Sequence, residues 1–301
     1  MKKRILPLLV MALLAVTLPA CRLWQAASPT PFIPAPMAVS LNVPYAEAEG
    51  VDPNLLSLDI YSPAPASGCP VMVMIHGGGW RQGDKANEDV AALKSQHFAA
   101  QGYVFVSVNY RLSPEVMHPV HVQDVAASLA WVYHNIWSYG GDPERIFIMG
   151  HSAGAHLAAL VATDEGYLEA NGLDLSILKG VVLLDGAGYD IPYMMDNDSV
   201  ILRSIYEGAF GTNPAAWEDA SPVAHVETGK NIPPFLLFYA GNREDSRVNS
   251  QKLADLLTDA GVQNWVVSAP DKNHGTINGD IGKDGDWVTE RIMEFLEEIS
   301  P

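Results

Sequence analysis

Residues 146–161 read IFIMGHSAGAHLAALV, with the pentapeptide Gly-His-Ser-Ala-Gly at residues 150–154 in the middle. The apolar run before the pentapeptide predicts a buried strand, and the small and apolar residues after it predict a helix. A serine on the tight turn between such a strand and helix has a strained backbone and a hydroxyl that stands clear of the sheet. The flanking glycines leave room for that turn to close. Ser152 is therefore the candidate nucleophile.

Short apolar runs alternate with helical patterns along most of the chain, which predicts a mostly parallel sheet with helices on both faces, an α/β fold. Residues 186–220 interrupt this alternation with aromatic residues among turn residues. We interpret them as a small cap insertion or as a loop packed on the core. The expected strands are 56–61, 71–75, 104–108, 146–149, 180–184, 234–239 and 264–268, and the expected helices are 86–100, 119–137, 153–163, 247–260 and 286–299.

The N-terminal region has the layout of a secretory signal. Residues 1–20 combine a basic start with a short apolar stretch, and Cys21 follows in a context similar to a bacterial lipobox. We expect Cys21 to be lipidated and residues 21–37, which are rich in proline, to form a tether to a catalytic domain at 38–301. An ordinary signal peptide or an uncleaved anchor is the alternative. The expected location is the bacterial cell envelope, as an outer-membrane lipoprotein or a periplasmic protein.

The charge balance excludes polyanionic partners. The chain has 18 Lys and Arg against 35 Asp and Glu, a net charge of −17, so its surface repels nucleic acid and anionic headgroups. With Cys21 lipidated, Cys69 has no partner for a disulfide. No cofactor or metal is predicted, because Pro119 breaks the helical spacing between His118 and His121 and no third ligand is near.

A serine hydroxyl needs donors that stabilise the oxyanion formed when it attacks a carbonyl. The strand at 71–75 ends in His-Gly-Gly-Gly-Trp at residues 76–80, where glycines let backbone N–H groups turn inward. We expect Gly77 and Gly78 to supply one part of an oxyanion hole. Ala153, at the N-terminus of the following helix, would supply the other.

The serine also needs a base and an acid, which should follow the carboxyl ends of later strands. His274 lies in the loop after the strand at 264–268 and is the expected base. Asp245 is the first choice for the acid because a helix is expected to begin directly after it. Asp185, at the end of the strand at 180–184, and Glu244 are the alternatives.

With these residues in place, the chain resembles the serine hydrolases of the α/β-hydrolase fold. It is most similar to the esterase/lipase group with bacterial feruloyl and acetyl esterases, hormone-sensitive-lipase-like carboxylesterases and kynurenine formamidases. The resemblance covers about residues 40–300. It rests on the motifs at 76–80 and 150–154, on Asn-Tyr-Arg-Leu-Ser-Pro at 109–114, on Gly-Asp-Pro at 141–143 with Arg145, and on His274. It implies Ser152, Asp245 and His274 as the catalytic triad and Gly77, Gly78 and Ala153 as the oxyanion hole.

The expected function is a serine carboxylesterase that hydrolyses small or aromatic acyl esters through an acyl-enzyme. The ester would be a small molecule or linked to a polysaccharide, and the lipid on Cys21 would hold the protein at the membrane. Trp80 and Tyr189 are the expected substrate-binding residues. An arylformamidase, similar to kynurenine formamidase, is the alternative activity. A hydrolase fold used only for binding is the alternative of another class.

Overall fold

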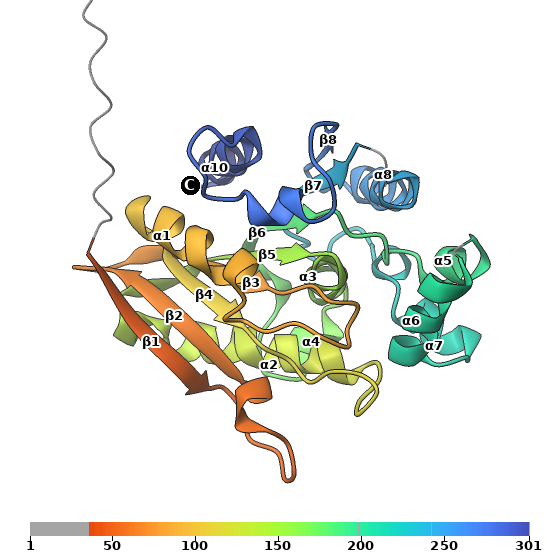
Figure 1. Ribbon diagram of the computed structural model, residues 1–301, viewed down its shortest axis with the longest axis horizontal. Helices are drawn as coiled ribbons and strands as arrows, with labels where there is room; N and C mark the ends of the chain where they lie inside the picture. Colours follow the sequence, from red (N-terminus) through yellow and green to blue (C-terminus); the bar gives the residue numbers. More distant parts are fainter. Residues whose placement is uncertain (1–35, 198, 242, 301) are drawn as a thin grey trace, which may run out of the picture. The chain divides into compact units, whose positions relative to one another are not determined.

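An eight-stranded sheet in the order β1-β2-β4-β3-β5-β6-β7-β8 lies at the centre of the computed structural model, which describes residues 36–197, 199–241 and 243–300 (Figure 1). The strands are β1 Met37–Pro44, β2 Ser57–Pro63, β3 Cys69–Ile75, β4 Val104–Val108, β5 Gly141–His151, β6 Leu178–Leu184, β7 Phe235–Ala240 and β8 Asn264–Ala269. The longer helices are α1 Leu93–Ala100, α2 Val120–Asn135, α3 Ala153–Thr163, α6 Val200–Phe210, α8 Glu244–Asp259 and α10 Trp287–Ile299. The shorter ones are α4 Gly166–Glu169, α5 Ile191–Asn197, α7 Pro214–Asp219, α9 Thr276–Gly279 and the π-helix η2 Glu88–Ala92, with 3-10 turns η1 Pro53–Leu56, η3 Ile136–Tyr139, η4 Leu175–Ile177 and η5 Pro222–Ala224.

The six strands from β3 to β8 run parallel, whereas β1 and β2 pair antiparallel at one edge. This arrangement confirms the predicted α/β-hydrolase fold, with every predicted strand in place. The sequence did not reveal β1, because it is an edge strand with few buried residues and hence no apolar pattern. β1 begins at Met37, one residue before the expected start of the domain.

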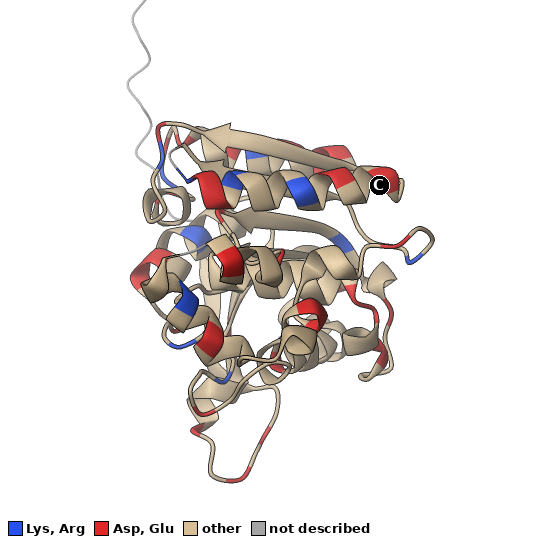
Figure 2. Cartoon of the chain, turned by 90° about the vertical axis from the view of Figure 1, so that its right-hand side faces the viewer, with Lys and Arg blue, Asp and Glu red and all other residues tan. Residues whose placement is uncertain are grey.

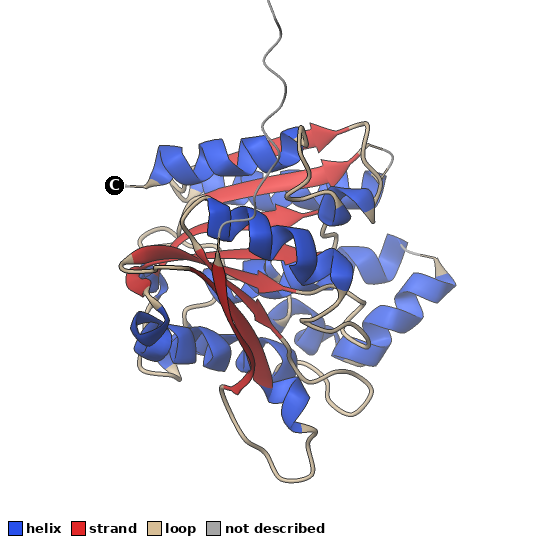
Figure 3. Ribbon diagram, turned by 60° about the vertical axis from the view of Figure 1, so that its left-hand side comes forward, coloured by secondary structure: helices blue, strands red, loops and turns tan. Residues whose placement is uncertain are grey.

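Helices cover both faces of the sheet, and successive residues of each central strand face opposite cores (Figure 3). In β3, Val71 and Val73 pack into the core covered by α2, α3 and α8. Met72 and Met74 pack into the core covered by α1 and α10. Because both faces are buried, the central strands read as near-continuous apolar runs. The sheet is thus a rigid platform whose carboxyl ends hold the functional residues.

The turn between β5 and α3 has a strained backbone. Ser152 has φ 55°, a left-handed conformation that is strained for a residue with a side chain. Gly154 lies against the end of β3, where a Cβ would overlap the carbonyl oxygens of Ile75 and His76. Only glycine allows α3 to approach β3 this closely, so the turn sets the position of Ser152 relative to residues 76–80.

Residues 186–220 form α5, α6 and α7, which lie together at one end of the domain, on the side to which the parallel strands point (Figure 1). Acidic and basic residues are scattered over this side rather than gathered into one basic patch (Figure 2). Among the described residues, no helix is long and apolar enough to cross a membrane. The expected signal peptide, the lipidated Cys21 and nearly all of the tether lie outside the described residues.

The close packing of Gly154, in the turn between β5 and α3, predicts that a larger residue there destabilises the protein. Gly154→Ala should lower the free energy of unfolding by about 1–3 kcal/mol, because the added Cβ overlaps backbone atoms that cannot move aside. Gly208→Ala is the matched control, since Gly208 is also helical but has no atom near the position of a Cβ. That variant should gain up to about 1 kcal/mol from helix propensity. Urea denaturation of both variants measures the difference, and equal stabilities would contradict the close approach of α3 to β3.

Candidate functional site

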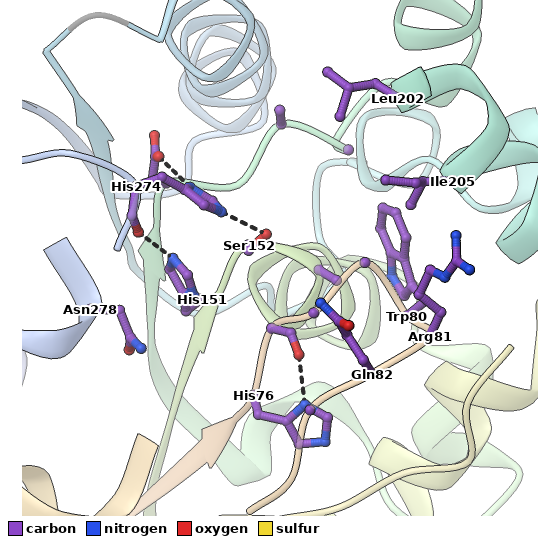
Figure 4. Close-up of a pocket in the computed structure, with 18 of the residues that line it drawn as sticks. His76, Trp80, Arg81, Gln82, His151, Ser152, Leu202, Ile205, His274 and Asn278 are labelled. Carbon is purple, nitrogen blue, oxygen red and sulfur yellow. Dashed lines mark hydrogen bonds and ion pairs between the residues drawn. The ribbon is translucent and has the colours of Figure 1, made fainter. Parts of the chain in front are cut away.

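Three side chains from three different strand ends meet at the carboxyl edge of the sheet (Figure 4). The Oγ of Ser152, after β5, lies 3.1 Å from Nε2 of His274, which follows β8. The Nδ1–H of His274 donates to Oδ2 of Asp185, after β6, over 2.7 Å. With Nδ1 protonated, Nε2 is free to accept the serine proton. The arrangement is a nucleophile, a base and an orienting carboxylate in series.

The acid in this series is Asp185, the second choice from the sequence, and not Asp245. Asp185 ends a buried central strand, and its side chain is inaccessible to solvent. Asp245 lies inside the first turn of α8, because this helix begins at Glu244 and not after Asp245 as expected. Its carboxylate forms an ion pair with Arg243 and no hydrogen bond to His274. Glu244, the remaining alternative, pairs with Arg247 on the exposed side of α8.

Electrostatics keeps Asp185 ionised. Burial alone would raise the pKa of this carboxyl, but hydrogen bonds from His274 and from the backbone N–H of Ala240 outweigh it and lower the pKa to about 2. The guanidinium of Arg243 adds to this effect, with its Nη1 3.3 Å from Oδ2 of Asp185. At neutral pH, Asp185 therefore carries a negative charge directly beside His274.

Arg243 connects Asp185 to Asp245, and sequence reasoning did not single it out. Its Nη1 also lies 2.6 Å from Nδ1 of His274. Asp245 thus reaches the base only through Arg243. An arginine two residues before an acidic one, after a strand, is a weak signal, and only the fold brings it against the base.

The glycine loop at residues 76–80, the expected source of oxyanion donors, lies beside Ser152. A Cβ on Gly77 would come within 3.1 Å of the Cβ of Ser152, so the loop passes directly beside the nucleophile. His76 Nδ1–H donates to the carbonyl oxygen of Gly77 over 2.7 Å. Because C=O and N–H point in opposite directions across a trans peptide, this bond turns the N–H of Gly78 away from His76. Gly77, Gly78 and Ala153, the three residues expected to form the oxyanion hole, all line the pocket that contains Ser152.

His151, the residue directly before Ser152, holds the loop that carries His274. Its Nε2–H donates to the backbone carbonyl oxygen of His274 over 2.8 Å, and the two rings lie 4.6 Å apart. Burial and the neighbouring His274 lower the pKa of His151 to about 3, so it is neutral at neutral pH. Sequence reasoning missed this residue because its role depends on a contact with a loop 123 positions away.

The pocket around Ser152 has a volume of about 1160 Å³ and two chemically different sides. Figure 4 shows Trp80, Leu202 and Ile205 on one side of Ser152, and His274 and Asn278 on the other. The first side is mostly apolar, with Tyr206 packed on Trp80, and Arg81 is the charged residue beside it. The side of His274 is mostly polar, because Arg243 lies against His274 and Asn278 is hydrogen-bonded to Asp89. The pocket is also lined by Asn87, Val90, Glu244 and Asp245.

Of the two expected substrate-binding residues, Trp80 lines this pocket but Tyr189 does not. Tyr189 is fully buried in the core, with its hydroxyl near Gly186. The expectation for Tyr189 was wrong because the first residues of the insertion pack into the core before the chain reaches the pocket. In the structure, Leu202, Ile205 and Tyr206 of α6 take that position.

Trp80 also joins the cap to the platform. Its indole N–H donates to Nδ1 of His156 over 3.2 Å, and His156 donates from Nε2 to the carbonyl oxygen of Ala220 over 2.7 Å. The Trp80 ring packs on Tyr206 and Phe210 at centroid distances of 5.2 and 4.8 Å. The apolar wall of the pocket is therefore fixed from both α3 and α6.

The geometry predicts which carboxylate acts on the base. Asp185→Asn should slow the labelling of Ser152 by a fluorophosphonate by about three to four orders of magnitude, because the amide no longer favours the tautomer with a proton on Nδ1 of His274. Asp245→Asn is the matched control and should slow it far less, since Asp245 acts only on Arg243. The rate of covalent labelling, followed by mass spectrometry, tests this without any assumption about substrate. A larger loss for Asp245→Asn would restore the assignment made from sequence.

Comparisons with known proteins place the chain in a family. Residues 58–259 match the family model described as BD-FAE. Esterase LipQ of Mycobacterium tuberculosis is 32% identical over 89% of this chain and 65% of its own length. Carboxylesterase NlhH of the same bacterium is 31% identical over 72% of this chain and 70% of its own length. The chain spans a smaller share of the length of other relatives, for example 49% of Esterase LipC of the same bacterium.

Solved structures show the same fold. Esterase B from Lactobacillus Rhamnosis superposes with a TM-score of 0.71 at 23% identity, covering 89% of this chain and 86% of that chain. The family model matches more than half of the sequence and so gives the family, and the solved structure gives the fold. The chain belongs to the BD-FAE family and has the α/β-hydrolase fold.

Proposed function

We propose that the protein is a serine carboxylesterase that acts through an acyl-enzyme. The observation that carries the proposal is the hydrogen-bonded series of Ser152, His274 and Asp185 beside a glycine loop, at the wall of a pocket. Relatives that bear the names of esterases and carboxylic ester hydrolases support it.

The proposed reaction follows from the atoms in place. Ser152 Oγ attacks the ester carbonyl while His274 Nε2 takes its proton, and Asp185 stabilises the charge on His274. The N–H groups of Gly78 and Ala153 receive the negative oxygen. His274 then gives the proton to the leaving alcohol, and the acyl group remains on Ser152. A water molecule, activated by the same base, releases the acid and restores the enzyme.

The two sides of the pocket fix the orientation of the ester in this mechanism. The leaving oxygen must face His274, so the alcohol part lies on the polar side, toward Asn278 and Asp89. The acyl part then lies on the apolar side, against Trp80 and Ile205. We infer a small or aromatic acyl group, since aromatic rings pack well on Trp80. A hydroxylated alcohol, including one linked to a polysaccharide, suits the hydrogen-bonding groups on the opposite side.

The central test is the removal of the nucleophile. Ser152→Ala should reduce the hydrolysis of p-nitrophenyl acetate at least about 10³-fold, because no other serine, threonine or cysteine among the described residues lines the pocket. Wild-type turnover of methyl ferulate, acetylated xylan and N-formylkynurenine in the same assay ranks the acyl groups and alcohols. Unchanged turnover by Ser152→Ala would reject the mechanism. A strong preference for N-formylkynurenine over all the esters would replace the carboxylesterase with an arylformamidase.

We also propose that the protein is exported and held in the bacterial cell envelope by a lipid on Cys21. The sequence of residues 1–21 supports this proposal. Cells fed labelled palmitate should incorporate the label into the wild-type protein but not into Cys21→Ser. Cys69→Ser is the control and should keep the label, because Cys69 lies in the folded domain. Labelling of Cys21→Ser would show that the lipid is attached to another residue.

A further inference from the structure

Three consecutive large apolar residues at the start of α6 are exposed to solvent. Val200 is 85% exposed, Ile201 is 76% exposed and Leu202 is 40% exposed. Burying such side chains is favourable, so an exposed cluster of them indicates a surface that meets another apolar phase. We call Val200, Ile201, Leu202 and Ile205 the α6 rim.

The α6 rim continues the apolar side of the catalytic pocket outward. Leu202 and Ile205 belong to the rim and also line the pocket beside Ser152 (Figure 4). Ile205 packs against the glycine loop, where its Cγ2 would lie 3.0 Å from a Cβ on Gly79. Ile201 lies one turn before Ile205 on the same face of α6 and extends this apolar surface into solvent. Val200, next to Ile201, adds a further exposed apolar side chain at the start of the helix.

The helix that carries the rim is held in place from below. Tyr206 and Phe210, on the inner side of α6, pack on the ring of Trp80. The backbone carbonyl oxygen of Ala209 also accepts a hydrogen bond from the N–H of His118 over 2.8 Å. The exposed residues thus lie on a fixed helix and point outward because its other side is already packed.

Charge selects the kind of surface that the rim can meet. The only ionic side chains of α6, Arg203 and Glu207, pair with each other at 3.1 Å, so the helix is neutral. The chain as a whole carries a net charge of −17 and is repelled by anionic surfaces. An uncharged apolar phase is the partner that suits both facts.

We propose that the α6 rim docks on the surface of aggregated, uncharged, apolar esters and passes single ester molecules to Ser152. The inference rests on the proposed carboxylesterase function and adds to it the physical state of the substrate. Short-chain triacylglycerol droplets are a suitable probe, because they form an uncharged apolar surface and their short acyl groups suit the mostly apolar side of the pocket.

The experiment compares tributyrin below and above its solubility limit, with dissolved p-nitrophenyl butyrate as the monomeric substrate. The wild-type rate on tributyrin should rise abruptly when droplets form. In the variant Val200→Ser with Ile201→Ser this rise should be lost, while the turnover of p-nitrophenyl butyrate stays unchanged because neither residue lines the pocket. The matched control replaces Val39 and Leu41 with serine. These residues are 47% and 58% exposed on the edge strand β1 and do not line the pocket.

Adsorption is measured separately from turnover, by depletion of the full-length Ser152→Ala protein from solution on tributyrin droplets. Adding Val200→Ser with Ile201→Ser should weaken adsorption at least about tenfold, from the loss of two apolar contacts. The β1 control should not change it. Adsorption without any hydrolysis by the wild type would reject the proposed function but keep the docking surface.

Several results would overturn the docking surface and leave the esterase intact. One is normal turnover of p-nitrophenyl butyrate with no rise on droplets. Another is an equal loss in the α6 and β1 variants, which would show a general effect of surface hydrophobicity. A third is a wild-type dimer, measured by light scattering, that becomes a monomer in the variant Val200→Ser with Ile201→Ser. That result would show that the α6 rim serves self-association.

Discussion

The close approach of α3 to the end of β3 is the constraint on which the site depends. A helix can begin directly behind the sheet only if its first turn carries no side chain toward β3, and Gly154 meets that condition. The approach forces Ser152 into its left-handed conformation and brings the glycine loop at residues 76–80 beside it. The nucleophile and the donors for the oxyanion are therefore positioned by the same contact. The strain on Ser152 is maintained because buried strands on both sides leave the turn no room to relax.

The base and its acid depend on a second condition, the exclusion of water around Asp185. A fully buried carboxylate must be compensated, and His274, the N–H of Ala240 and Arg243 together provide the compensation. Asp245 is partly exposed and already neutralised by Arg243, so it has no such demand for a partner. His274 therefore forms its hydrogen bond with the buried carboxylate of Asp185. His151 completes the arrangement by holding the backbone of the loop that carries His274.

The cap contributes in a different way, through apolar packing on one tryptophan. Trp80 leaves the glycine loop and inserts between His156 on α3 and Tyr206 and Phe210 on α6. The wall that would receive the acyl group is thus continuous with the loop that supplies the oxyanion donors. A change in α6 alters the shape of the acyl side without touching the reacting atoms. The opposite side includes residues of η2, α8 and α9 and is mostly polar, with Val90 as an apolar member.

The sequence by itself determined seven strands of the sheet, their alternation with the main helices along the chain, the serine and the histidine that contacts it. These follow from local signals: buried strands are continuous apolar runs, the elbow needs glycines at fixed positions, and chain order leaves one suitable histidine loop after the last strand. Only the tertiary structure decided the acid, since Asp185 and Asp245 both follow strand ends and differ only in burial and in the start of α8. It also decided that Tyr189 is buried while α6 lines the pocket, and it revealed the roles of His151 and Arg243. Each of these depends on contacts between distant segments, which no local pattern in the sequence encodes.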